Sequence, residues 1–157
     1  MKTIEYPLDN TGGLSYIYAI PESAYKQTGY TSSGGRKLEL YATGGVICIP
    51  CLYSRFDFSE ERQESDSGDL YEIIVSGFIY GITGDNSETV EKLRNGAWLV
   101  MTKDIDGMCL LAGSNNVRMI FEYQTSTGKG RAALKGTAFE FKCTDQYPAI
   151  ILAEHPF

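Results

Sequence analysis

Apolar and polar residues alternate along several stretches of this chain, with the period of two that is typical of a half-buried β-strand. In residues 117–124, the alternation puts Phe121 and Tyr123 on the same side of the expected strand. In residues 133–143, the same alternation puts Phe139 on one side of the expected strand. The segment between these two stretches is rich in glycine. Because glycine favours tight turns, the pattern predicts a β-hairpin here.

Other segments rich in apolar and β-branched residues predict further strands, at 14–20, 38–41, 46–53, 70–80, 97–102, 108–112 and 149–153. The longest of them, 70–80, is expected in the middle of a sheet, with Gly77 marking a bulge or a close approach of backbone. Glycine-containing turns predict that 38–41 pairs with 46–53, and that 97–102 pairs with 108–112.

One segment predicts a helix, over residues 86–95. Asp85 and Glu88 have the spacing of a capping box, Val90 and Leu93 fall on one face, and Gly96 is suited to a left-handed stop.

About eight strands with one helix, joined by local hairpins, indicate a mainly β protein. The expected fold is an antiparallel β-sandwich or barrel with one short flanking α-helix. No linker divides residues 1–157, so we expect a single domain. Two polar stretches are not needed by the core, at about 22–37 and 57–69. We expect long loops at both, and for 57–69 the alternative is a strand extension.

Composition narrows the classes of partner. The chain has 157 residues, and its 14 Lys and Arg against 20 Asp and Glu give a formal net charge of −6. An acidic surface disfavours general or sequence-specific nucleic-acid binding and binding to anionic membranes. The sequence shows neither a signal peptide nor a run long enough for a membrane span, so we expect the cytoplasm.

The four cysteines are Cys48, Cys51, Cys109 and Cys143. Cys48 and Cys51 have C-x-x-C spacing, but a zinc site needs a second ligand pair, and a redox site needs a helix after the first thiol. Neither context is present in the sequence. We therefore interpret the cysteines as reduced side chains that pack in the core.

Six of the acidic residues lie close together in the stretch 57–69, at Asp57, Glu60, Glu61, Glu64, Asp66 and Asp69. The stretch lacks the full pattern of a calcium loop, and we expect a solvated, self-repelling segment. Such a segment is suited to line a channel or to protect a sheet edge.

Candidate catalytic chemistry is sparse. The only histidine, His155, lacks a recognisable nucleophile and orienting group, and we expect it to be exposed. Lys129 lies among glycines, but in a different order from a phosphate-binding loop. No spacing singles out a pair of carboxylates for glycoside hydrolysis. We expect a non-enzymatic protein with no metal and no cofactor.

Tyrosines in the polar stretch 22–37 are candidates for an interface. Tyr25 and Tyr30 are not explained by a core, and Arg36 with Lys37 gives the stretch a basic end. These four residues fit a surface that contacts a partner. The alternative is a ligand-binding β module in which the tyrosines stack on carbohydrate.

Several short segments occur in an order that resembles small structural proteins of phage and prophage tail modules, over residues 46–152. The segments are 53–58 (YSRFDF), 67–72 (SGDLYE), 93–100 (LRNGAWLV), 104–107 (DIDG), 111–113 (LAG) and 148–149 (PA). The resemblance implies a β-sandwich or barrel whose copies join into rings or tubes through sheet edges and long loops. It brings no catalytic residues.

The function expected from these features is that of a ring- or tube-forming component of a phage-type tail. Its partners are then copies of itself and other tail proteins, and its location is the cytoplasm before assembly and the virion afterwards. A net charge of −6 is compatible with a passage in which DNA slides without binding. The alternatives are the carbohydrate-binding module and an enzyme that uses acidic residues.

Overall fold

The computed structural model describes residues 12–52, 55–66, 68–130 and 132–157. These residues are mainly β-structure with one α-helix, as the sequence predicts. The elements are β1 (Leu14–Pro21), the 3-10 turn η1 (Glu22–Ala24), β2 (Tyr25–Tyr30), β3 (Arg36–Leu40), β4 (Ile47–Pro50), β5 (Asp57–Ser65), β6 (Gly68–Tyr80), α1 (Gly84–Arg94), β7 (Trp98–Asp104), β8 (Cys109–Ala112), β9 (Ile120–Ser126), β10 (Gly136–Asp145) and β11 (Ile150–Leu152).

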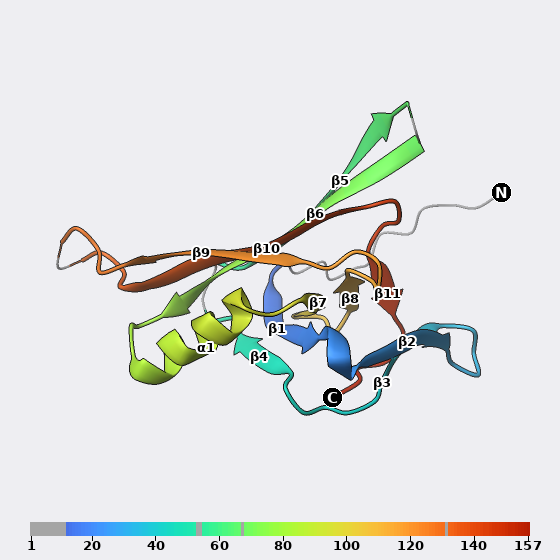
Figure 1. The fold of residues 1–157 in the computed structure, drawn as a ribbon, viewed down its shortest axis with the longest axis horizontal. Helices are drawn as coiled ribbons and strands as arrows, with labels where there is room; N and C mark the ends of the chain where they lie inside the picture. Colours follow the sequence, from blue (N-terminus) through green and yellow to red (C-terminus); the bar gives the residue numbers. More distant parts are fainter. Residues whose placement is uncertain (1–11, 53–54, 67, 131) are drawn as a thin grey trace.

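The strands form three antiparallel sheets (Figure 1). The five-stranded sheet has the order β11-β8-β7-β1-β4, and the four-stranded sheet has the order β5-β6-β10-β9. Strands β2 and β3 form a separate two-stranded sheet. The arrangement is sandwich-like and is not a closed barrel, which decides between the two architectures that the sequence left open.

The main core lies between the two larger sheets. Alternate residues of β6 and β10, such as Val75 and Phe141, point into it, and β1 contributes Ile17 from the opposite layer. A second apolar cluster, which includes Leu99 and Met101, covers the other face of the five-stranded sheet. Because β7 is buried on both faces, its apolar residues run without alternation.

The helix is present, but its ends differ from the expectation. Its N-cap is Thr83, whose Oγ1 accepts a hydrogen bond from the Asn86 N–H at 3.2 Å, and not Asp85. Gly96 does not adopt the left-handed conformation. Glycine is needed at this position because a Cβ would lie 2.4 Å from the Trp98 ring. The Nε1 of that ring donates a hydrogen bond to the Leu93 carbonyl at 2.7 Å. An indole caps this helix.

The sequence predicts that Gly77 marks either a bulge or a close approach of backbone, and the structure confirms the second. A Cβ at this position would lie 2.5 Å from Cδ1 of Phe56 and 2.6 Å from Cζ of Phe139. The pairing of β6 with β10 passes Gly77 without a shift of register. The glycine therefore marks a close approach of side chains to backbone, and not a bulge.

Two of the three predicted hairpins are present, and one prediction is wrong. Strands β7 and β8 pair, as do β9 and β10, and β11 adds the expected edge strand beside β8. However, β3 pairs with β2, and β4 pairs with β1. The glycine-containing turn before β4 predicts the wrong partner, because Ile49 of β4 packs in the main core beside β1, a strand that is distant in the sequence.

The stretch 22–37 contains strands instead of the expected long loop, and 57–69 is the strand extension that the sequence left open as the alternative to a loop. Residues 22–37 hold η1, β2 and the start of β3, and the chain reverses at 31–35. Residues 57–69 hold β5 and the start of β6. Residues 59–65 of β5 are polar because both faces of the strand meet solvent there, whereas β2 and β3 pack one side against the second apolar cluster, through residues such as Tyr25 and Leu38. The polarity of these stretches indicates exposed strand positions and not an irregular backbone.

Candidate functional site

The four-stranded sheet projects beyond the body of the protein at two places (Figure 1). Pairing of β6 with β10 ends at Tyr71 and Asp145, so the residues of β6 that precede Tyr71 pair only with β5. At the opposite end of β6, Tyr80 pairs with Gly136, and the β9–β10 connection continues outward from there. We call residues 61–69 the acidic arm and residues 127–135 the basic tip.

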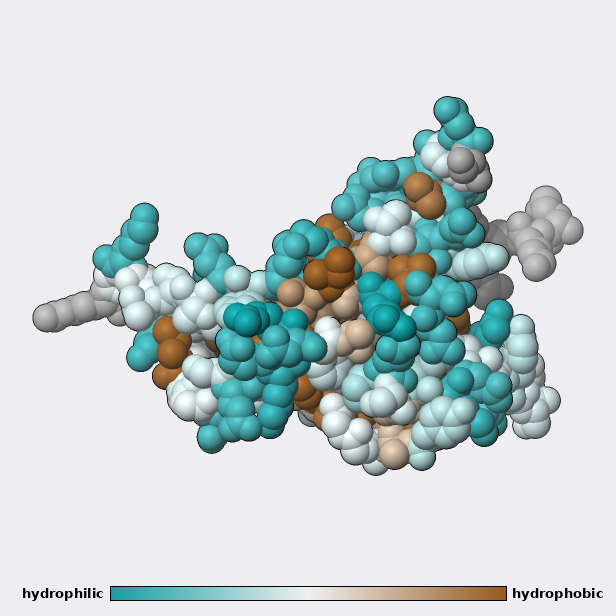
Figure 2. Space-filling view, viewed as in Figure 1, coloured by the Kyte–Doolittle hydropathy of each residue, from teal (hydrophilic) through white to brown (hydrophobic). Residues whose placement is uncertain are grey.

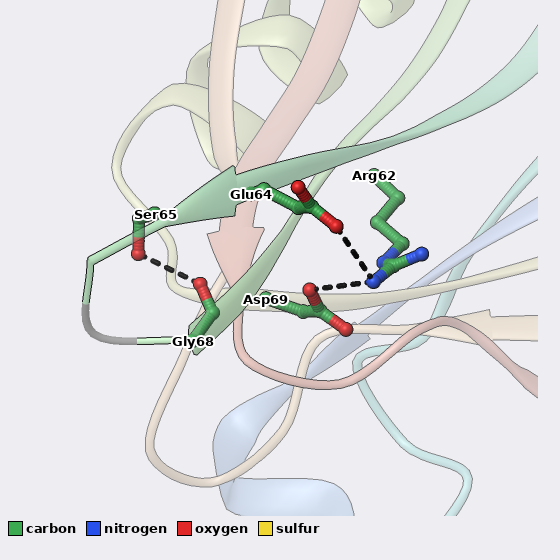
Figure 3. A network of polar contacts seen from close by, with 5 residues as sticks. All are labelled: Arg62, Glu64, Ser65, Gly68 and Asp69. Carbon is green, nitrogen blue, oxygen red and sulfur yellow. Dashed lines mark hydrogen bonds and ion pairs between the residues drawn. The ribbon is translucent and has the colours of Figure 1, made fainter.

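The acidic arm is held by its own polar contacts (Figure 3). The Arg62 guanidinium lies 2.9 Å from Oδ1 of Asp69 and 3.4 Å from Oε1 of Glu64. The hydrogen bond to Asp69 raises the pKa of Arg62. At the turn, the Ser65 hydroxyl donates to the Gly68 carbonyl at 2.7 Å. Figure 2 shows that hydrophilic residues cover most of this projection.

The structure divides the six predicted acidic residues between several positions, so the expectation of one acidic loop is wrong. Successive side chains of a strand point to opposite faces. Asp57 and Glu61 lie on the side away from the core, whereas Glu60 and Glu64 lie on the core side. Asp66 is in the turn, and Asp69 is on β6. Oε2 of Glu60 accepts a hydrogen bond from the Ala149 N–H at 2.6 Å, which ties β5 to the segment before β11.

The side of the four-stranded sheet that faces away from the core is called the open face here. It brings together five carboxylates and one cation from all four strands: Asp57, Glu61, Glu72, Glu122, Glu140 and Lys142. The net charge of these groups is −4. Glu61 pairs with Glu72, and Glu140 pairs with Glu122, directly across neighbouring strands.

Like charges at directly opposed positions destabilise a sheet. Lys142 offsets one of these pairs, because its Nζ lies 2.6 Å from Oε2 of Glu122 and 3.6 Å from Oε1 of Glu140. The hydrogen bond to Glu122 raises the pKa of Lys142. A shallow hollow of about 290 Å³ lies beside these groups and is lined in part by Gln124 and Ala138.

Sequence analysis missed Glu72, Glu122 and Glu140. Each alternates with a core residue in a predicted strand, so the period of two indicates that all three point away from the core. The fact that they share one face with Asp57 and Glu61 follows only from strand order and register.

The predicted interface residues lie on the hairpin of β2 and β3. Tyr30 and Arg36 pair across the strands, and the guanidinium carbon of Arg36 lies 4.5 Å from the centre of the Tyr30 ring. Lys37 forms an ion pair with Glu39 at 3.0 Å. Hydrogen bonds from Gln27 and Lys37 lower the pKa of Glu39.

Tyr25 lies apart from this group. It begins β2, packs partly against the second apolar cluster, and shares a hydrogen bond of 3.1 Å with the Thr28 hydroxyl. It is five residues from Tyr30, a distance of about 16 Å along a strand. The two tyrosines therefore do not form one platform.

The C-x-x-C pair also does not form one site. Cys48 lies opposite Tyr18 on one side of the five-stranded sheet, whereas Cys51 packs against the main core on the other side. Burial raises the pKa of Cys51 to about 12 and that of Cys143 to about 11. Thiols with a raised pKa are poor nucleophiles at neutral pH. Cys109 and Cys143 are buried and Cys51 is half-buried, which fits the packing interpretation, but Cys48 is exposed, so that interpretation is wrong for Cys48.

His155 is half-buried, and not exposed as expected. Its ring meets Tyr18 edge-on, with centroids 5.3 Å apart, and its Nδ1 lies 2.5 Å from the Phe157 carbonyl oxygen. Within the described ranges, no group of three His, Cys, Asp or Glu side chains is suited to hold a metal ion. Nor does that part of the chain contain a helix that is both long and apolar enough to cross a bilayer.

Comparisons with protein-family models, with curated proteins and with solved structures find no match to this chain.

Proposed function

We propose that this protein is a non-enzymatic assembly protein that forms a closed ring with copies of itself, of the kind that builds a phage-type tail. The observation that carries the proposal is the four-stranded sheet with two open edges. In the part of the chain that the structure describes, no strand pairs with the outer side of β5 or of β9. An open edge presents unpaired N–H and C=O groups to another chain.

The directions of the two edge strands suit head-to-tail contact. Neighbouring strands in this sheet are antiparallel, so β5 and β9 run in opposite directions. A second copy in the same orientation therefore presents its β9 antiparallel to the first copy's β5. Contacts between two different patches generate a ring when the rotation closes.

The bulk of the protein sets the direction of curvature. The five-stranded sheet lies entirely on the core side of the four-stranded sheet, and the hairpin of β2 and β3 covers its far side. A closed ring has more room outside than inside, so this layer occupies the outside. The open face then lines the passage, and its net charge of −3 per copy, with Arg55 included, repels the phosphates of DNA.

The resemblance of residues 46–152 to tail-module proteins supports the same function. In this proposal the partners are copies of the chain and other tail proteins. The protein resides in the cytoplasm before assembly and in the virion afterwards.

The test is the solution mass of the full chain, by native mass spectrometry and by light scattering after size exclusion. We expect one closed oligomer that is a whole multiple of the 17.4 kDa chain. A monomer at every concentration tested would contradict the proposal.

Proline substitutions in β9 test the edge itself. Successive N–H groups of a strand point alternately toward and away from its partner, so one of Gln124→Pro and Thr125→Pro removes an outward N–H and leaves the pairing with β10 intact. We expect that variant to fold as a monomer. Gln124→Val and Thr125→Val keep every N–H and should still form the ring.

A further inference from the structure

The acidic arm is a two-stranded sheet that the described part of the protein leaves uncovered. Residues 59–66 are all exposed. Glu61, Glu64, Asp66 and Asp69 against Arg62 give the arm a charge of −3. Arg62 is already paired with two of these carboxylates, and no Lys or Arg among the described residues pairs with Glu61 or Asp66.

The basic tip has the opposite charge. The described residues of 127–135 contain Lys129 and Lys135 and no carboxylate, which gives a charge of +2. Lys129 and Lys135 are exposed, and no carboxylate of the described residues forms an ion pair with either. Arm and tip thus carry opposite charges that are incompletely compensated within one copy.

The arm and the tip project from opposite ends of the same sheet. The arm lies where β6 begins, and the tip lies where β6 ends, a separation of about 40 Å for its 13 residues. Copies joined edge to edge in one orientation place all their arms at one end and all their tips at the other. In such a ring, an arm is too far from a neighbour's tip to contact it.

We propose that the acidic arm is a docking surface for the basic tip of a second copy, which joins copies end to end in addition to the edge contacts. Charge complementarity selects this occupant, because the arm at −3 faces the described part of the tip at +2 in this orientation, whereas two arms or two tips repel each other. The inference rests on the proposed function and adds a direction to the assembly, since only opposite ends attract.

The experiment compares end-to-end association of the full chain at about 0.05 M and about 1 M NaCl, because the Debye length falls to about 3 Å at 1 M. Negative-stain images and sedimentation count the stacked particles, and native mass spectrometry reports the single ring. We expect stacks at low salt and at least tenfold fewer at high salt, with the mass of the ring unchanged.

Charge exchange identifies the two partners. Glu61→Lys with Glu64→Lys and Asp66→Lys changes the arm from −3 to +3, and Lys129→Glu with Lys135→Glu changes the described part of the tip from +2 to −2. Each exchange alone should form rings that do not stack. A chain that carries both exchanges should stack again, because arm and tip then attract each other whereas two arms or two tips still repel. Lys129→Arg with Lys135→Arg keeps the charge and should stack as the unmodified chain does.

The outcomes separate this inference from the proposed function. Rings that stack equally well at both salt concentrations, rings that never stack, or a chain with both exchanges that fails to stack overturn the docking and leave the ring in place. A monomer under every condition overturns both. Far-UV circular dichroism and thermal melting confirm that each variant keeps the fold.

Discussion

Strand β6 passes through two environments, and the contrast separates the parts of this protein that are held by burial from those that are not. In the body, Ile73 and Val75 are 1% and 0% exposed and lie among the aromatic side chains of β10. In the arm, the same strand pairs only with β5, and both faces meet solvent. The hydrogen-bonding pattern is continuous across both parts.

The difference between the two parts of β6 shows that the arm extends the sheet without burying apolar side chains. Ordering a residue costs about 1–2 kcal/mol of conformational entropy, and burial normally offsets it. In the arm, only the backbone ladder and the exposed ion pairs of Arg62 are available, and exposed ion pairs stabilise weakly. The arm is therefore held by its backbone ladder and by exposed ion pairs, whereas the body is held by burial.

The largest expected effect comes from removing an aromatic side chain of the body. Phe141 is fully buried between Phe121 and Phe139, and Phe141→Ala should lower the free energy of unfolding by about 3–5 kcal/mol through lost burial and the cavity left behind. Urea unfolding measures the change.

The matched change in the arm replaces residues 64–69 with an Asn-Gly turn, which keeps Gln63 paired with Leu70. Because these residues contribute nothing to the core, the free energy of unfolding should stay within about 0.5 kcal/mol of the original. A loss comparable to that of Phe141→Ala would show that the arm stabilises the body, and the contrast between the two regions would then be wrong.

A smaller effect is expected from adding one methyl group. Gly77→Ala should cost about 1–3 kcal/mol because its Cβ would collide with Phe56 and Phe139. The matched control in the basic tip is Gly130→Ala, where no atom lies within 4 Å of the added Cβ. Equal unfolding midpoints in urea for these two variants would contradict the tight packing that we assign to the body.

The smallest expected effect is a loss of stability in alkali. Burial raises the pKa of Cys51 from 9.0 to about 12 and that of Cys143 from 9.0 to about 11. Between pH 9 and these values, the unfolded chain has lost thiol protons that the folded chain still holds. The free energy of unfolding should therefore be steady below pH 9 and fall as pH rises toward 11.

Urea unfolding at intervals across that range measures the slope, and Cys51→Ala should make it shallower. An unchanged slope in this variant would show that Cys51 is not among the groups responsible.

The sequence predicts the elements that local signals define. The apolar alternation of β6 and β10 and the turns of two hairpins appear where the pattern indicates. Local signals fail where the partner is distant: the glycines before β4 suggest pairing with β3, but Ile49 finds its place beside β1. Thr83, and not Asp85, caps the helix because a cap depends on the geometry with which the chain enters it.

The candidate site was only partly predictable for the same reason. The acidic residues of 57–69 stand out in the sequence, but their division between two faces depends on strand alternation that the polar composition conceals. Glu122 and Glu140 lie 18 positions apart in the chain and become neighbours only through the register of β9 and β10. Turn length and strand order, which set that register, are not local properties.

The indole that caps the helix has a practical consequence. Trp98 is the only tryptophan of the chain, is 5% exposed, and lies in the body where α1 meets β7. Its fluorescence therefore reports the integrity of the body alone: its emission should shift to the red when the sandwich opens and stay unchanged when the arm is bound or removed. The protein carries a built-in optical probe that distinguishes unfolding from assembly.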